Sequence, residues 1–232
     1  MIPFPSDIEV KDGDVVAVDL ETYDPQLKTH GSGAIIGNGF VCGIAIAYRN
    51  ETFYFPMEHK GPKLATNLVW KVLNKKIFQN EKINKVFHNA MYDVCWIRSA
   101  TGLMPKGNLY DTMIAASVID ENRKSYSLDS LSADYLNDKK YKYDLKDRAL
   151  AEHGIADPMS NMDKLPYDLV KDYAEQDVSL TLRLWKKFKE IIGGPLIVKW
   201  ETIIIVQSSV RRRFYFLHES GAFVVKFPHI RC

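Results

Sequence analysis

The sequence is poor in cysteine. Its 232 residues include three cysteines, Cys42, Cys95 and Cys232, and no two of them form a Cys-x-x-Cys pair. Cysteine and histidine show no spacing typical of a zinc site, and nothing indicates a disulfide framework. Cys42 and Cys95 lie inside apolar segments, where a free thiol behaves as a small hydrophobic group. These features are typical of a protein from a reducing compartment.

Long apolar runs are absent as well. No uninterrupted stretch of the sequence approaches the roughly 18 apolar residues that a membrane-spanning helix requires. The first residues, Met-Ile-Pro-Phe-Pro, have neither the positive charge nor the apolar stretch of a secretory signal. We therefore expect a cytoplasmic protein with no membrane partner.

A strong charge of either sign is also missing. Lys and Arg number 31 against 29 Asp and Glu, so the formal net charge is +2. This balance neither demands nor excludes a nucleic-acid partner. Hydrophobic residues make up 46% of the chain and charged residues 26%, which is ordinary for a globular protein, and the length suits one domain with a sizeable core.

What the sequence does contain is four acidic residues in three short motifs. Asp19 and Glu21 end the apolar run Val-Val-Ala-Val-Asp-Leu-Glu-Thr. Asp93 lies in Phe-His-Asn-Ala-Met-Tyr-Asp, and Asp177 lies in Tyr-Ala-Glu-Gln-Asp. Each acid ends or interrupts an apolar pattern, where a lone negative charge is unfavourable unless a positive group compensates it.

The spacing of these acids predicts that they gather in space. Side chains two residues apart on a strand share a face, so Asp19 and Glu21 should point the same way. Residues four apart on a helix are neighbours, which places Tyr173 beside Asp177. Two like charges about 4 Å apart repel by roughly 4 kcal/mol at an effective dielectric near 20, so such a cluster needs protons or metal ions. Hard oxygen ligands favour Mg²⁺ or Mn²⁺.

Hydrophobic periodicity predicts a chain of alternating strands and helices. Strands are expected at 15–20, 40–48, 51–56, 85–87 and 109–110, and the second and third should form a hairpin through Arg49-Asn50. Helices are expected at 64–78, 89–100, 112–119, 128–136 and from 166 to about 191, with Ser127 as an N-cap. Residues 23–38 indicate a loop, and the polar segment 137–163 shows only weak periodicity.

Taken together, the motifs resemble the DnaQ-like 3′-to-5′ exonucleases of the DEDDy type, and especially the proofreading domains of DNA polymerase I-like (family A) DNA polymerases. The matching segments are Asp19-Leu20-Glu21-Thr22, Asn89-Ala90-Met91-Tyr92-Asp93 and Tyr173-Ala174-Glu175-Gln176-Asp177. Asp111-Thr112-Met113 and Tyr126-Ser127-Leu128 also look like family segments. The resemblance covers about residues 12–190, and the tyrosine of the third motif distinguishes this type from relatives with histidine there.

The resemblance implies an α/β protein with an RNase H-like fold, in which a mixed five-stranded sheet is flanked by helices. It also implies two divalent cations, Mg²⁺ or Mn²⁺. In that scheme Asp19 bridges both ions, and Glu21 and Asp177 hold the ion that activates water. Asp93 supports the second ion through water. Tyr173 would orient the attacking water, because a phenol with an ordinary pKa of about 10 is a poor base at pH 7.

Further expectations concern the substrate. Thr22 could contact the terminal nucleotide through its hydroxyl or its backbone. Leu20 or Met91 could wedge against bases, although Leu20 could equally be a core residue on the opposite face of its strand. Asn89 could form a hydrogen bond near the substrate or cap its own helix. His88 has no Cys or His partner at metal-ligand spacing, which favours a packed or hydrogen-bonded histidine.

The implied function is metal-dependent removal of nucleoside 5′-monophosphates from a single-stranded or frayed DNA 3′ end, as in proofreading during DNA replication. Two alternatives stay open, an RNase D-like 3′ exoribonuclease and a non-catalytic nucleic-acid-binding or scaffolding domain. Residues 1–192 should form the exonuclease domain. Residues 193–232 are a tail of uncertain structure or the truncated start of a polymerase region, so a polymerase module in cis or in trans is an expected partner.

Overall fold

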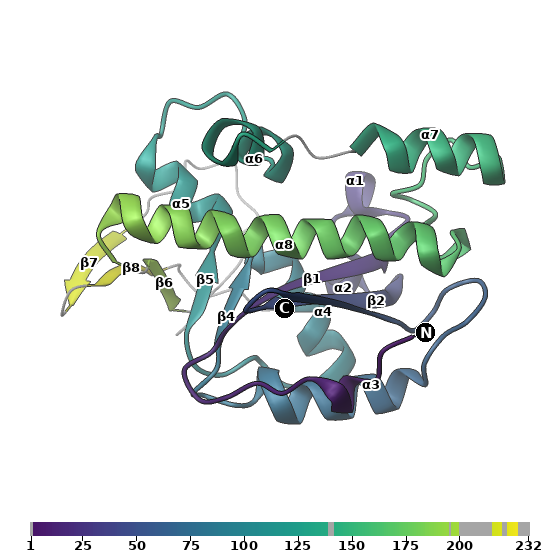
Figure 1. Ribbon diagram of the computed structural model, residues 1–232, viewed down its shortest axis with the longest axis horizontal. Coiled ribbons are helices and arrows are strands. Elements are labelled where there is room, and N and C mark those ends of the chain that lie inside the picture. Colours follow the sequence, from purple (N-terminus) through teal and green to yellow (C-terminus); the bar gives the residue numbers. More distant parts are fainter. Residues whose placement is uncertain (1, 139–141, 195, 200–214, 220–221, 227–232) are drawn as a thin grey trace.

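The protein is built around one mixed β-sheet (Figure 1). The structure is a computed structural model, and it describes residues 2–138, 142–194, 196–199, 215–219 and 222–226. The strands lie in the order β3-β2-β1-β4-β5-β6-β8-β7. Their bounds are β1 Val15–Tyr23, β2 Phe40–Tyr48, β3 Glu51–Pro56, β4 Asn84–Phe87, β5 Leu109–Asp111, β6 Leu196–Lys199, β7 Tyr215–Glu219 and β8 Ala222–Lys226.

The first five strands form the predicted mixed sheet. β1 lies at its centre because the run Val15–Val18, which is β-branched and small, suits a strand covered on both faces. β1 pairs antiparallel with β2 and parallel with β4. β2 and β3 form the predicted hairpin, and β4 pairs parallel with β5. With the helices on both faces, this arrangement confirms the predicted fold class.

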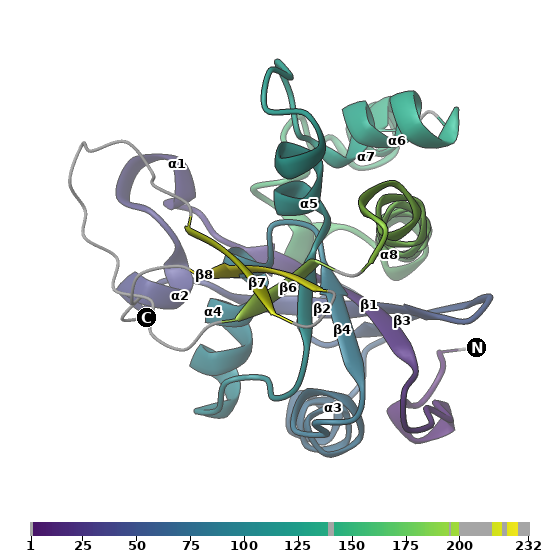
Figure 2. The same cartoon turned by 90° about the vertical axis from the view of Figure 1, so that its left-hand side faces the viewer.

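Helices cover the two faces of the sheet unequally (Figure 2). The longest helix, α8, packs across β1, β2, β3 and β4, with α5, α6 and α7 on the same side. α3 and α4 lie on the other side. The bounds are α1 Leu27–His30, α2 Gly33–Ile36, α3 Thr66–Leu73, α4 Ala90–Thr101, α5 Thr112–Ile119, α6 Leu128–Leu136, α7 Lys142–His153 and α8 Tyr167–Ile192, with short turns η1 Pro5–Asp7, η2 Asn74–Phe78 and η3 Met162–Lys164.

Most of the predicted elements are confirmed, and the differences before β6 fall in polar segments. The Ser127 hydroxyl accepts the backbone N–H of Ser130 at 3.3 Å, so the predicted N-cap of α6 is present. The segment expected to be a loop contains the short helices α1 and α2, and the segment of weak periodicity contains α7. Among the described residues, no helix is both long and apolar enough to cross a bilayer.

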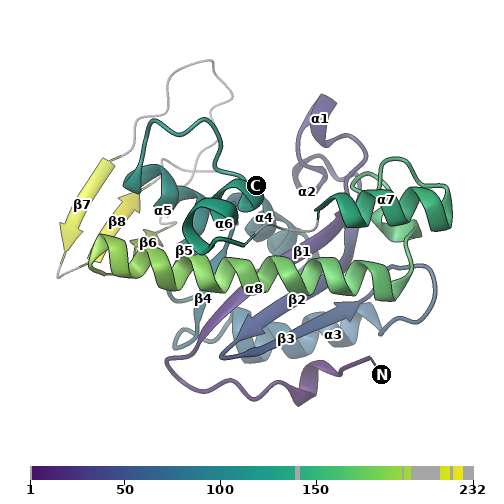
Figure 3. The ribbon, with the colours of Figure 1, turned by 45° about the horizontal axis from the view of Figure 1, so that its top comes forward.

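Three strands that the sequence did not predict extend the sheet beyond β5. β6 pairs antiparallel with β5, β8 pairs parallel with β6, and β7 pairs antiparallel with β8. Figures 1 and 3 both show this group at the C-terminal end of α8. Much of the predicted tail 193–232 lies outside the described residues, and its division from residues 1–192 stays a prediction.

A lysine lies in the buried part of β4. The Lys85 side chain has no exposed surface, and its ammonium donates to the carbonyls of Asn80, at 2.6 Å, and Lys106. Burial lowers the pKa of Lys85 to about 8, because desolvation disfavours the charged form. The ammonium thereby joins two connecting segments at the start of β4.

We expect Lys85→Met to lower the free energy of unfolding by about 1–3 kcal/mol at pH 7, because two carbonyls lose their donor. The loss should grow as the pH rises from about 8 towards 10.5, because in that window the unfolded chain binds the extra proton and wild-type stability increases. Denaturant unfolding at several pH values measures both effects. Lys106→Met, whose side chain is 56% exposed, should follow the wild-type pH dependence. If the difference in free energy of unfolding between wild type and Lys85→Met stayed constant with pH, the prediction would be contradicted.

Gly43 of β2 allows a close approach between a strand and an aromatic ring. A Cβ at this position would lie 2.1 Å from the hydroxyl oxygen of Tyr54, whose side chain is fully buried. We expect Gly43→Ala to lower the free energy of unfolding by about 2 kcal/mol or more, because the ring has little space to move. In a double-mutant cycle by denaturant unfolding, the free energy of unfolding that Gly43→Ala/Tyr54→Leu loses should be clearly less than the sum of the losses in the two single variants. Additive losses would show that the ring is not the obstacle.

Candidate active site

The end of β1 carries the first two acids of the predicted site. Alternation along the strand puts Asp19 and Glu21 on the face of Ala17, which packs in the core beneath α8. Glu21 is buried and Asp19 is half-buried. The pairing with β2 shifts directly after Glu21, and such a bulge changes the direction of the following side chains. Leu20 points to the other face and is buried in the core there, which favours its interpretation as a core residue.

Helix α8 brings the third motif to the same place. Tyr173 and Asp177 are one turn apart, as their spacing predicted, and both are buried. Burial raises the pKa of the Tyr173 phenol well above its usual value. The charges that raise it further include those of Asp177, Glu21 and Asp19, in that order. Three acids from a strand and a helix therefore lie within electrostatic reach of one hydroxyl group.

Asp93 approaches β1 from the first turn of α4. It is buried, and its Oδ1 accepts the backbone N–H of Leu20 at 3.1 Å. This contact places the carboxylate next to the peptide unit that joins Leu20 to Asp19. Burial raises the pKa of Asp93, and the charge of Asp19 raises it further. The charge of Asp19 thus raises the pKa of both Tyr173 on α8 and Asp93 on α4.

Asp111, which was not predicted as a site residue, holds the helix that carries Asp93. Its Oδ1 accepts the backbone N–H of Asn89 at 3.1 Å and of Met113 at 2.8 Å, and its Oδ2 accepts that of Ala90 at 2.8 Å. One carboxylate therefore ties the start of α4 to the start of α5. The signal was present in the sequence, because an Asp directly before a helix is a preferred N-cap.

A second polar bridge joins the residues next to the acids. The hydroxyls of Thr22 and Tyr92 are 2.7 Å apart, and the Tyr92 hydroxyl donates to Asp24 at 3.1 Å. Asp24 in turn accepts the backbone N–H of Gly33 at 3.0 Å, at the start of α2. The hydroxyl of Thr22, expected to contact a nucleotide, is therefore already engaged with Tyr92, and its substrate role stays a prediction.

The remaining residues of the second motif have mixed outcomes. Asn89 is exposed, adopts a left-handed backbone with φ 71°, and makes no side-chain capping bond, so its predicted capping role is wrong. The ring Nδ1 of His88 lies 2.8 Å from the hydroxyl of Thr112, which confirms a hydrogen-bonded histidine. Met91 is half-buried beside Tyr92. Substrate contacts of Asn89 and Met91 stay predictions.

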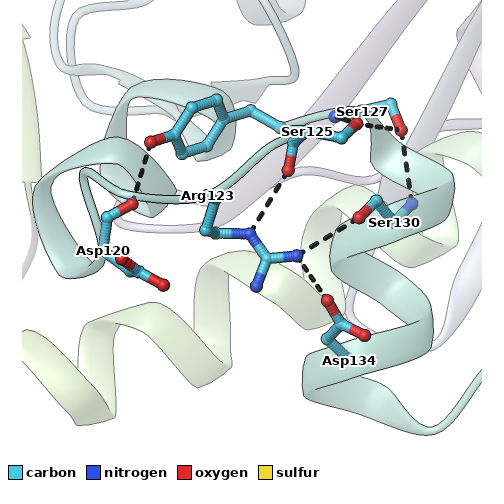
Figure 4. A network of polar contacts seen from close by, with 7 residues as sticks. Asp120, Arg123, Ser125, Ser127, Ser130 and Asp134 are labelled. Atoms are coloured by element: carbon cyan, nitrogen blue, oxygen red, sulfur yellow. Dashed lines mark hydrogen bonds and ion pairs between the residues drawn. The ribbon is translucent and has the colours of Figure 1, made fainter.

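A network of polar contacts positions α6 beside this site (Figure 4). The Arg123 guanidinium donates to Asp134, to the hydroxyl of Ser130 at 3.2 Å and to the carbonyl of Ser125 at 3.3 Å. These contacts hold the segment between α5 and α6 against the first turns of α6. Asp129 lies in that first turn, and its charge is among those that raise the pKa of Tyr173.

The donor set of this site suits a hard cation. The four predicted acids supply only oxygen ligands, which are those that Mg²⁺ and Mn²⁺ prefer. Their charges raise the pKa of both Asp93 and Tyr173, which reflects a negative potential that a cation would relieve. In the described ranges, however, no three His, Cys, Asp or Glu side chains are arranged as a complete metal site. The residues fit divalent ions by chemistry, and the fit by coordination geometry stays a prediction.

Known proteins resemble this chain in sequence. It is 29% identical over 187 residues to a DNA polymerase I from Borreliella burgdorferi, an alignment that covers 78% of this chain and 18% of that protein. The chain spans 18% of the length of each of the first curated relatives that it matches.

Solved structures resemble it in fold. Brucella melitensis NrnC bound to pGG aligns with a TM-score of 0.55 and 20% identity, covering 78% of this chain and 74% of that one. A Trypanosoma brucei RNase D in complex with GMP aligns with a TM-score of 0.56 and 17% identity, covering 75% and 50%. At these identities the likeness concerns the fold alone, which is RNase H-like.

A family model decides the family. The model described as 3′-5′ exonuclease matches residues 8–193. This range includes β1, α4 and α8, the three elements that carry the four acids. The chain therefore belongs to this 3′-5′ exonuclease family.

Proposed function

We propose that the protein is a metal-dependent exonuclease that removes nucleoside 5′-monophosphates from the 3′ end of single-stranded DNA. The observation that carries this proposal is that α8, with buried Tyr173 and Asp177, packs on β1, whose end carries Asp19 and Glu21. Asp93 reaches the same strand end through the N–H of Leu20. Membership of a 3′-5′ exonuclease family supports the reaction. The similarity to a DNA polymerase I supports DNA as the substrate and proofreading as the task.

The four acids are the proposed cation ligands. Asp19, Glu21 and Asp177 would hold one divalent cation, and Asp19 with Asp93 would hold a second. Bound ions of this kind lower the pKa of the attacking water and stabilise the charge that develops on the leaving 3′ oxygen. The acids themselves remain ionised in that state, because the cations offset their mutual repulsion.

Tyr173 acts as a neutral phenol. Burial is the first cause of its raised pKa, so the hydroxyl keeps its proton at neutral pH. A protonated hydroxyl can position water by hydrogen bonding but cannot accept the proton of that water as a base. We therefore propose positioning of the attacking water as its role.

RNA is the second candidate substrate. The chain shares its fold with an RNase D in complex with GMP, so the fold is compatible with this candidate. The two substrates differ at the 2′ position, so the preference depends on contacts to that hydroxyl. A polymerase module in cis or in trans and a cytoplasmic location belong to the proposal as well.

The first test compares DNA and RNA oligonucleotides of one sequence, labelled at the 5′ end, with Mg²⁺ or Mn²⁺. We expect a ladder of products shortened from the 3′ end, and faster cleavage of DNA. Asp19→Asn/Glu21→Gln should cleave more than about 100-fold more slowly, because loss of direct metal ligands should exceed the effect of losing their outer-shell partners. Glu175→Gln, which lies on α8 and contacts Thr52 instead, is the matched control and should stay within about threefold of wild type.

The outcomes separate the alternatives. Faster cleavage of RNA would favour the exoribonuclease, and binding without cleavage would favour a scaffolding domain. Equal rates for wild type and Asp19→Asn/Glu21→Gln would contradict the assignment of these acids.

A second test concerns Tyr173. We expect Tyr173→Phe to reduce the rate at saturating substrate about 10- to 100-fold, because the attacking water loses a positioning hydrogen bond. The pH–rate profiles of wild type and variant between pH 6 and 9 should be parallel, because the phenol is neutral throughout this range. If wild type showed a titration in this range that Tyr173→Phe lacked, Tyr173 would be a base and the proposed role would be wrong.

A further inference from the structure

A buried polar pair lies behind the acid pair of β1. Gly43 of β2 is paired directly with Glu21 across the antiparallel ladder. Directly paired positions of such a ladder project from the same face, with Cβ positions about 5 Å apart. Glycine leaves the space beside Glu21 empty on this strand, and the Tyr54 side chain from β3 fills it. The Tyr54 hydroxyl oxygen lies 2.1 Å from the point where a Cβ of Gly43 would be.

This geometry brings the Tyr54 hydroxyl within reach of the Glu21 side chain. The hydroxyl lies near a point about 5 Å from the Cβ of Glu21, and an extended glutamate side chain spans that gap. The electrostatics agree with the geometry. After burial, the charge of Glu21 is the largest influence that raises the pKa of Tyr54, and Asp19 also contributes.

His59 is a hydrogen-bond partner of the Tyr54 hydroxyl. The Nε2 atom of His59 forms a hydrogen bond with the Tyr54 hydroxyl, and the two rings meet edge to face with centroids 5.6 Å apart. Tyr167 from the start of α8 stacks on the Tyr54 ring at 6.1 Å. Tyr54 is fully buried and His59 is 4% exposed, so neither ring can turn away into solvent.

The pair is polar where an apolar core would suffice. Cys42, Ala45 and Ala47 belong to the same core as Tyr54, and a phenylalanine would fill the ring's volume without a hydroxyl to desolvate. Burial lowers the pKa of His59 to about 4, so the imidazole is neutral at neutral pH. A neutral partner can hold the hydroxyl without adding a positive charge that would compete with cations for Glu21 and Asp19.

We propose that Tyr54 and His59 are a positioning pair that holds the Glu21 carboxylate in place for cation binding. The inference rests on the proposed function, because it assigns Glu21 as a ligand. Tyr54 itself touches neither cation nor substrate, and it acts through Glu21. Outer-shell partners of this kind commonly change metal affinity 10- to 100-fold.

The test measures Mn²⁺ binding by isothermal titration calorimetry, together with the Mg²⁺ dependence of cleavage. We expect Tyr54→Phe to weaken Mn²⁺ binding about 10-fold and to raise the half-saturating Mg²⁺ concentration to a similar extent, with the rate largely restored at high Mg²⁺. His59→Leu should behave like Tyr54→Phe. His59→Gln, whose amide can still bond the hydroxyl, should stay closer to wild type.

Tyr110→Phe is the matched control for a lost buried hydroxyl. Tyr110 is 5% exposed, and its hydroxyl donates to Asn84 at the start of β4. Asn84 is paired with Val15, the first residue of β1, which lies roughly 20 Å along the strand from Glu21. Thermal unfolding should show a lower midpoint for both Tyr→Phe variants, and only Tyr54→Phe should change the cation dependence.

The results distinguish this inference from the proposed function. If Tyr54→Phe and His59→Leu bind Mn²⁺ as tightly as wild type, while Asp19→Asn/Glu21→Gln does not, the positioning pair is overturned and the exonuclease proposal stands. If Tyr110→Phe shifts the cation dependence equally, the effect is general loss of stability and the inference is wrong. If wild type neither binds Mn²⁺ nor cleaves DNA, both proposals fail together.

Discussion

Repulsion among buried carboxylates is the constraint on which the rest of the structure depends. Glu21, Asp93 and Asp177 are each less than a tenth exposed, and Asp19 lies among them. Burial and like charge both disfavour the ionised form, so these acids need either protons or bound cations to offset their charge. The local fold gains little from such an arrangement, whereas the proposed cation-dependent reaction would use it. Two helices bring acids to β1, because α4 carries Asp93 and α8 carries Asp177.

Asp93 and Asp111 show how environment separates two buried aspartates with different tasks. Burial raises the pKa of both. Four backbone N–H groups oppose that effect at Asp111, from Ala90, Asn89, Ile114 and Met113. At Asp93 the second influence is instead the charge of Asp19, which raises the pKa further. The Asp111 carboxylate is therefore stabilised by backbone N–H groups and joins the starts of two helices. The Asp93 carboxylate instead lies in the negative potential of Asp19.

The sequence predicted the elements whose information is local. The hairpin of β2 and β3 follows from its alternation and turn, and α5 and α6 begin and end where apolar spacing and Ser127 predicted. The positions of the acids could be predicted because each motif falls at a strand end or in a helix turn. The helices in segments 23–38 and 137–163 could not be predicted, because they are short or polar. They depend on tertiary contacts such as the hydrogen bond from the Gly33 N–H to Asp24. Leu20 and Asn89 had two interpretations each, since only packing decides between them.

The layer behind the acids could not be predicted for a different reason. Tyr54 and His59 are five residues apart and have no motif, and their relation to Glu21 exists only through the pairing of Gly43 across the ladder. A glycine in a strand weakens it unless another group needs the space, and here a phenol occupies that space. The partner behind the phenol is an imidazole that burial keeps neutral. A lysine or arginine there would satisfy Glu21 permanently and remove the negative potential that attracts cations, so a neutral polar layer is the arrangement that holds a carboxylate in position and leaves its charge available.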